Sequence, residues 1–182
     1  MTRRRFAPII RPVLEHAIGG LDPAPFRTPE AHERLERLGR RFPDDRAALE
    51  AACQLAPDPD LALLGAERFA DAAGALPRER DLMQALALLC GASRLVAGLL
   101  AREPRLLRRA ARSPRLTQPR TEPELRRLLA RAGDRIGPED VDGFHRLLRR
   151  LRAREVIRIA LRDLRRARMS EVTEELSALA AA

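Results

Sequence analysis

The chain has 182 residues, of which 45% are hydrophobic and 34% charged, so it is long enough to bury a core and unlike a disordered protein. It contains 31 alanines and 30 leucines against 5 valines and 6 isoleucines, with no tryptophan or tyrosine. Because helices favour alanine, leucine, arginine and glutamate, whereas strands favour β-branched and aromatic residues, this composition predicts an all-α protein. The absence of lysine excludes a P-loop lysine and a Schiff-base lysine.

The positive charge is concentrated in one stretch of the chain. Residues 1–101 carry no net charge, residues 102–168 carry a net charge of +12, and residues 169–182 carry a net charge of −3. Such a stretch suits contact with phosphate, nucleic acid or an acidic protein face, and it also suits a solvated helical surface paired with acids elsewhere. The arginine runs contain no tyrosine or tryptophan for base stacking, so nucleic acid ranks last among these partners.

The sequence shows no targeting signal. It has no run of about 18 apolar residues and no N-terminal apolar segment followed by a cleavage site, so we expect neither a membrane span nor a signal peptide. Cys53 and Cys90 lie among alanines and leucines, which is typical of small buried thiols in a reducing compartment. These features predict a cytoplasmic protein.

Proline, glycine and capping residues divide the chain into about nine or ten short helices and one long helix near the C-terminus. Residues 1–27 are expected to form an N-terminal arm with a short helix at 8–18, and residues 28–182 one helical region. Thr28 and Asp58 each precede a proline, a combination preferred where a helix starts. We expect helices over residues 28–41, 44–55 and 58–73, further helices from Pro77, Ser93, Pro104 and Thr121, a long helix over about 138–168, and a last helix after Ser170.

The long helix carries an apolar stripe that changes sides. At about 100° per residue, one face of its first half is apolar, with Val141, Phe144, Leu147, Leu148 and Leu151. That face continues with polar side chains, and the apolar residues of the second half, Ile157, Ala160, Leu161 and Leu164, fall on the opposite side. We therefore expect the helix either to kink near Ala153 or to pack against different neighbours along its length, as a strut between two layers.

Few residues suit catalysis or metal binding. The pairs Asp58/Asp60 and Asp140/Asp142 have the Asp-x-Asp spacing that can hold Mg²⁺, but each stands at a helix start, where acids cap the helix and favour its dipole. The three histidines are scattered, and no nucleophile elbow occurs. We predict no catalytic residue and no metal ligand in this chain.

Two segments of the sequence are similar to a known family. Residues 148–164, LRRLRAREVIRIALRDL, and the following SEVTEELSAL at 170–179 strongly resemble the N-terminal region of bacterial glutamine synthetase adenylyltransferases, and residues 88–107 resemble the helices that precede it. The similarity is close over residues 140–182 and lower over the rest of 30–182. The resemblance implies an enzyme that transfers AMP from ATP to a tyrosine of glutamine synthetase and removes it again by phosphorolysis, which regulates nitrogen assimilation.

The resemblance also implies cofactors and partners. In that family a Gly-Ser-rich turn and paired aspartates on a sheet hold ATP with Mg²⁺, and the partners are glutamine synthetase and a nitrogen-regulatory signalling protein. This sequence contains no such turn followed by paired aspartates, so none of the family's catalytic or metal residues can be placed on it. We therefore expect an N-terminal helical fragment, inactive alone, that packs against a missing catalytic domain.

The candidate functional residues are three arginines on the polar continuation of the first apolar face. Arg154, Arg158 and Arg162 are expected to contact phosphate or an acidic partner. The alternative is that they pair with Glu155 and Asp163 at helical spacing. Two other functions stay open: a stand-alone helical interaction module without an exposed apolar surface, and an arginine-rich nucleic-acid-binding domain.

Overall fold

The computed structural model of the chain describes residues 22–134, 136–137, 139–164 and 169–182. In this part of the chain the fold is all-α, as predicted, with nine α-helices and one short 3-10 helix. The helix expected at residues 8–18 lies outside the described residues. In chain order the elements are α2 (Pro29–Arg41), η1 (Pro43–Asp45), α3 (Arg46–Gln54), α4 (Pro59–Ala73), α5 (Arg80–Ala92), α6 (Arg94–Arg102), α7 (Arg105–Ala111), α8 (Glu122–Gly133), α9 (Val141–Asp163) and α10 (Met169–Ala181).

Most helix starts follow the predicted capping signals. The side chains of Thr28, Asp58 and Ser93 each accept a hydrogen bond from the backbone N–H three residues later, at 3.3, 3.0 and 3.3 Å. Thr121 and Glu124 form a capping box at the start of α8. These side chains satisfy backbone donors that have no partner within their own helix, which explains why the helices begin where they do.

The connection from α4 to α5 confirms one prediction and corrects another. Gly74 ends α4 with φ +72°, a left-handed conformation that a glycine adopts without strain. The helix expected from Pro77 begins only at Arg80, because the carbonyl of Glu79 accepts the first α-helical hydrogen bond, from the N–H of Met83 at 3.0 Å.

Helices α2–α7 form the first layer and contain most of the hydrophobic core, which is built chiefly from leucine and alanine. Within it α4 and α5 cross closely, since a Cβ added at Gly65 would lie 2.4 Å from the Cβ of Cys90. Cys53 and Cys90 are both buried there with free thiols, as predicted. Helix α9 closes this core with Ile157 and Leu161, neither of which is exposed.

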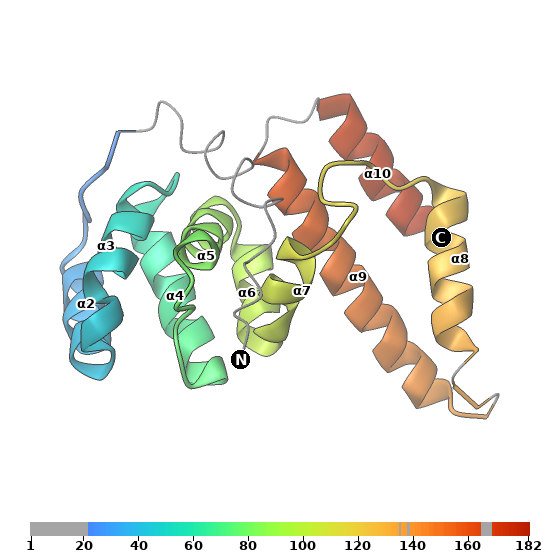
Figure 1. Ribbon diagram of the computed structural model, residues 1–182, viewed down its shortest axis with the longest axis horizontal. Helices are drawn as coiled ribbons and strands as arrows, with labels where there is room; N and C mark the ends of the chain where they lie inside the picture. The colour runs from blue at the N-terminus through green and yellow to red at the C-terminus, as the bar shows by residue number, and fades with distance from the viewer. Residues whose placement is uncertain (1–21, 135, 138, 165–168) are drawn as a thin grey trace, which may run out of the picture.

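Helix α9 is continuous and separates the first layer from a second one made by α8 and α10 (Figure 1). The expected strut is therefore present, and over the described residues no break occurs near Ala153. The first apolar face is less buried than its periodicity predicts, with Val141 60% and Phe144 39% exposed. Helix α8 lies beside this half of α9 in Figure 1, and it covers only part of that face.

Candidate functional site

The three candidate arginines lie on the second half of α9, but two of them face the protein interior. The side chains of Arg158 and Arg162 are 0% and 4% exposed, while that of Arg154 is 34% exposed. Arg158 and Arg162 face α10 and the loop between α7 and α8. The polar continuation of the first face is therefore a buried surface, with a helix packed over it.

The buried arginines bind carboxylates of their own chain. Arg158 Nε donates to Glu155 Oε2 at 2.7 Å, and Arg158 Nη2 donates to Glu175 Oε1. Arg162 Nη1 donates to the other oxygen of Glu175, and Arg162 Nη2 donates to Glu171 Oε2 at 3.3 Å. We call Glu155, Arg158, Arg162 and Glu175 the buried cluster; it holds α10 against α9.

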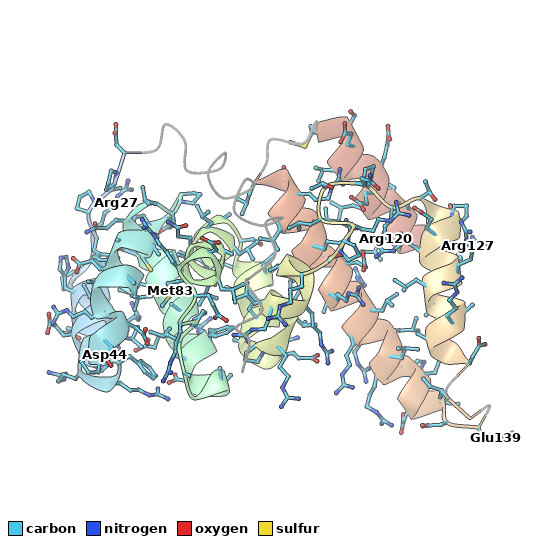
Figure 2. All side chains as sticks on the ribbon, viewed as in Figure 1. Arg27, Asp44, Met83, Arg120, Arg127 and Glu139 are labelled. Atoms are coloured by element: carbon cyan, nitrogen blue, oxygen red, sulfur yellow. The ribbon has the colours of Figure 1, made fainter. Side chains whose placement is uncertain are left out.

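The loop before α8 is tied to the same cluster. Arg158 Nη1 donates to the backbone oxygen of Arg115 at 3.1 Å, and the backbone N–H of Arg120 donates to Glu175 Oε1 at 2.7 Å. Figure 2 shows Arg120 at this junction of the loop with α9 and α10. A buried polar group without a partner is costly, so these backbone contacts stabilise the buried charges of Arg158 and Glu175.

Sequence reasoning identified only part of this arrangement. The pairing of Arg158 with Glu155 was predicted as the alternative, whereas Asp163 is exposed and makes no such contact with the described residues. The role of Glu175 is not among the sequence-based predictions. A signal for it exists, because Glu171 and Glu175 repeat the four-residue spacing of Arg158 and Arg162, which places each pair on one helix face.

Positive charge exceeds negative charge at the edge of the buried cluster. Arg120 Nε lies 3.2 Å from Glu155 Oε2, and Arg154 Nε lies 3.8 Å from Glu155 Oε1, but neither contact is aligned as a hydrogen bond. Burial lowers the pKa of Arg120, and the neighbouring guanidiniums, with that of Arg158 first, lower it further, although Glu155 opposes this shift. One carboxylate is thus shared among three guanidiniums.

The aspartate pairs serve the helix starts, as predicted. Asp58 caps α4, and Asp140 Oδ1 accepts a hydrogen bond from the N–H of Gly143 at 2.7 Å at the start of α9. Asp60 accepts from the N–H of Arg27 at 3.0 Å. In the described part of the chain, no three histidine, cysteine, aspartate or glutamate side chains come together as a metal site.

The two thiols have no electrostatic activation. Burial raises the pKa of the Cys53 thiol, and it raises that of Cys90 to about 12. A thiol becomes a nucleophile by losing its proton, which these environments oppose. Both cysteines therefore act as small core residues.

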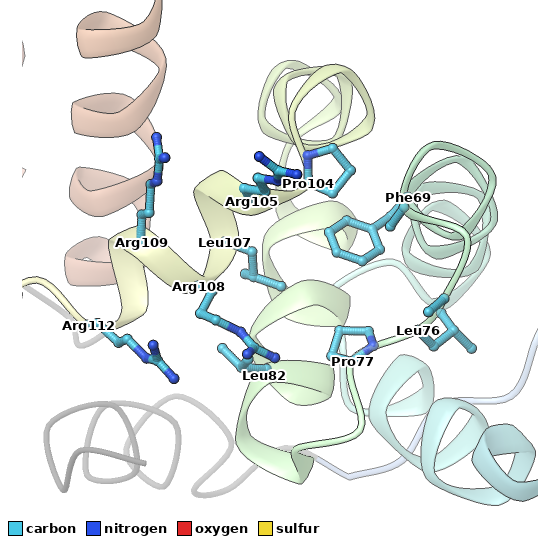
Figure 3. A pocket seen from close by; sticks show the side chains of 12 residues that line it. Phe69, Leu76, Pro77, Leu82, Pro104, Arg105, Leu107, Arg108, Arg109 and Arg112 are labelled. Atoms are coloured by element: carbon cyan, nitrogen blue, oxygen red, sulfur yellow. The ribbon is translucent and has the colours of Figure 1, made fainter. Parts of the chain in front are cut away.

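A cleft of about 440 Å³ opens between α4, α5 and α7 (Figure 3). Its apolar wall includes Phe69, Leu82 and Leu107, and arginines of α7 stand at its rim. Arg108 at the rim contacts both carboxylate oxygens of Glu79, at 2.9 and 3.0 Å. The described residues that line the cleft include no carboxylate, histidine or cysteine, so they offer an apolar binding surface without acid–base chemistry.

Comparison with known families identifies the chain. The sequence pattern of the glutamate-ammonia ligase adenylyltransferase family matches residues 83–182, more than half of the chain, from the first turn of α5 through α10. The chain belongs to this family. Glutamate-ammonia ligase is glutamine synthetase, so the resemblance described above is confirmed, and glutamine synthetase is the substrate partner of the adenylyltransferase family.

The match to the adenylyltransferase family includes the whole buried cluster and the loop that joins it. Neither the curated proteins nor the solved structures that were compared with the chain give a match. No helix among the described residues combines the length and the apolar character needed to cross a membrane.

Proposed function

We propose that this chain is a helical scaffold of a glutamine synthetase adenylyltransferase and that the AMP transfer takes place on another part of the enzyme. The observation that carries this proposal is the buried cluster. Within the family-matched region, the buried charged side chains Glu155, Arg158, Arg162 and Glu175 contact one another, and none of them is left for a substrate.

The buried carboxylates and the helix-capping aspartates do not fit Mg²⁺ and ATP, and no three potential ligands come together among the described residues. Transfer of AMP from ATP calls for carboxylates that hold Mg²⁺ beside the phosphates. Glu155 and Glu175 already accept from guanidiniums, and Asp58 and Asp140 cap helices. A carboxylate used in this way is not available to a metal ion, so we assign no step of the AMP transfer to these four residues.

The first half of α9 supplies a surface on which a partner domain of such a scaffold docks. Val141 and Phe144 are exposed, and Arg146, Arg149 and Arg150 are exposed on the same half of the helix. At about 100° per residue these arginines fall on the other side of α9 from Val141 and Phe144, so the docking surface is the apolar face itself, which suits an apolar surface on the partner. This exposed apolar surface favours the scaffold over a stand-alone module, whose apolar residues would be covered.

In this proposal the reaction and the binding of its partners take place in the assembled enzyme. We infer that the nucleotidyltransferase domain of the enzyme packs on the first half of α9. That domain transfers AMP to a tyrosine of glutamine synthetase and removes it by phosphorolysis, under control of a nitrogen-regulatory protein in the cytoplasm. The chain contributes the position of that domain relative to glutamine synthetase.

Two measurements test this function, an activity assay and a binding assay. The chain is incubated with glutamine synthetase, ATP and Mg²⁺, and AMP on the synthetase is measured by intact-protein mass spectrometry. We expect no AMP above the background without the chain, and AMP transfer by the chain itself would refute the proposal.

The binding arm uses the nucleotidyltransferase domain of such an enzyme and isothermal titration calorimetry. We expect Phe144→Ser to weaken binding at least about tenfold, because a buried aromatic anchor carries much of an interface. Leu95→Ser removes a matched exposed apolar side chain from α6 and is expected to leave binding unchanged. Absence of binding, or equal losses for both variants, would contradict the scaffold role.

A further inference from the structure

A second cleft, of about 210 Å³, lies between α8 and the loop that precedes it. Its lining consists of four arginines, one glutamate and one leucine: Arg115, Arg120, Glu124, Arg127, Leu128 and Arg131. Figure 2 places Arg120 at the loop and Arg127 on α8. Arg127 and Arg131 are four residues apart on α8, so their side chains leave the same face of the helix.

The one carboxylate of this cleft is already occupied. Glu124 Oε1 accepts from Arg115 Nη2 at 2.8 Å, and Glu124 Oε2 accepts from the N–H of Thr121 at 3.0 Å in the capping box. Arg120 is turned towards Glu155, which it shares with Arg158 of the buried cluster. Neither carboxylate is therefore available to the two remaining arginines of the lining.

Arg127 and Arg131 meet no carboxylate among the described residues. Arg127 Nε donates to the backbone oxygen of Pro123 at 3.2 Å, which leaves the terminal nitrogens of this guanidinium for a ligand. The cleft as a whole has an excess of three positive charges over the charge of Glu124. Cations held together by the fold repel one another, and a bound anion relieves that repulsion.

We propose that this cleft binds a phosphate-bearing anion, held by Arg127 and Arg131 with support from Arg115 and Arg120. Guanidinium groups present paired N–H donors that match the oxygens of a phosphate, and they stay charged at all physiological pH values. The inference goes beyond the scaffold role and does not depend on it, because all the residues used belong to this chain.

The size of the cleft selects the kind of anion. Sites for whole small-molecule ligands have volumes of about 300–1,000 Å³, so a cleft of about 210 Å³ accommodates a phosphate or diphosphate group rather than a complete nucleotide. Leu128 is the one apolar side chain in the lining, so no aromatic or broad apolar surface is present among these residues to hold a base. The charged group alone is the ligand that these residues recognise.

Isothermal titration calorimetry with the full chain tests the proposal, using pyrophosphate as the probe in a phosphate-free buffer of constant ionic strength. We expect one pyrophosphate per chain and weaker binding of sulfate. Arg127→Gln and Arg131→Gln each remove one guanidinium that meets no carboxylate among the described residues, and each is expected to weaken pyrophosphate binding at least about fivefold. Arg94→Gln on α6 makes the same charge change away from the cleft and is expected to alter binding less than twofold.

Circular dichroism of each variant checks that the fold is retained, which is expected because Arg127 and Arg131 are exposed. The proposal is overturned if pyrophosphate does not bind, if sulfate binds equally well, or if Arg94→Gln weakens binding as much as Arg131→Gln. Titration with hexaglutamate separates phosphate recognition from a preference for acidic protein segments. Tighter binding of hexaglutamate than of pyrophosphate, lost in Arg131→Gln, would overturn the phosphate assignment.

Discussion

Replacement of Glu175 by alanine tests whether the buried cluster holds the second layer in place. The Glu175 side chain is 1% exposed and accepts hydrogen bonds from Arg158, Arg162 and the backbone N–H of Arg120. Glu175→Ala removes all three acceptor contacts and leaves two buried guanidiniums short of a carboxylate. Such a change is more disruptive than the loss of one surface ion pair, because the charges that remain cannot reach water.

Whether α10 stays in place depends on how the free energy lost with Glu175 compares with the small apolar contact of this helix. Breaking a buried ion pair by removing one partner costs about 3–5 kcal/mol. The other buried residue of α10 is Val172, and full burial of a valine contributes about 1.5–3 kcal/mol. The loss therefore equals or exceeds the apolar contribution that remains, and we expect α10 to separate from α9 while the core of α2–α7 stays folded.

Hydrogen exchange followed by mass spectrometry resolves this local effect. A loss of about 3 kcal/mol corresponds to roughly 100-fold faster exchange, so the amides of α10 are expected to exchange at least that much faster in Glu175→Ala. Glu174→Ala changes the adjacent exposed glutamate and is expected to stay within about 0.5 kcal/mol of the unaltered chain. Equal exchange in the two variants would show that the buried cluster does not stabilise α10.

Three further outcomes are expected. Gly65→Ala brings a methyl carbon to 2.4 Å from the Cβ of Cys90, and we expect it to lower the free energy of unfolding in urea by about 1–3 kcal/mol. Gly98→Ala meets open space in α6 and is expected to raise that free energy by up to about 1 kcal/mol, so equal effects would contradict the close crossing. Both thiols are expected to resist dithionitrobenzoate at pH 8 in the folded chain and to react with it in denaturant. The reason is that burial raises the pKa of both thiols, that of Cys90 to about 12. Rapid reaction of the folded chain would contradict this expectation. The hydrogen bond from the backbone of Thr121 lowers the pKa of Glu124, so its charge stabilises the fold above the ordinary carboxyl pKa of about 4.3 and ceases to do so as the pH falls through the lowered value. Glu124→Gln is therefore expected to be less stable than the unaltered chain at pH 7, with a difference in urea midpoint that closes towards pH 3; a constant difference would contradict the shift.

The helix boundaries were predictable because their signals are local. Thr28, Asp58 and Ser93 act on backbone groups three residues away, so each capping contact is contained in a short stretch of sequence. Helix α5 starts three residues later than Pro77 predicts, because Pro77 fits an extended segment before the helix as well as a first helical turn. Proline marks the neighbourhood of a helix start more reliably than its first residue.

The environment of the candidate arginines was not predictable from the wheel of one helix. Arg158 and Arg162 stand on a polar face, and a polar face is read as solvent-exposed unless the element covering it is known. That element is α10, and Glu175 lies 17 residues after Arg158 in the sequence. The converse error concerns Phe144, whose periodic position predicts burial but which stays partly exposed at the first half of α9.

These contacts explain the uneven distribution of charge along the sequence. The acidic stretch 169–182 supplies Glu171 and Glu175, which bind arginines of the basic stretch 102–168, so the two opposite charges form one structural unit. This pairing uses the arginines at the second half of α9. On α8, by contrast, Arg127 and Arg131 meet no carboxylate among the described residues, and both border the cleft. The same excess of arginine thus has two consequences: where acids of α10 cover it, it stabilises the fold, and where no acid covers it, it provides a site for an anion from outside the chain.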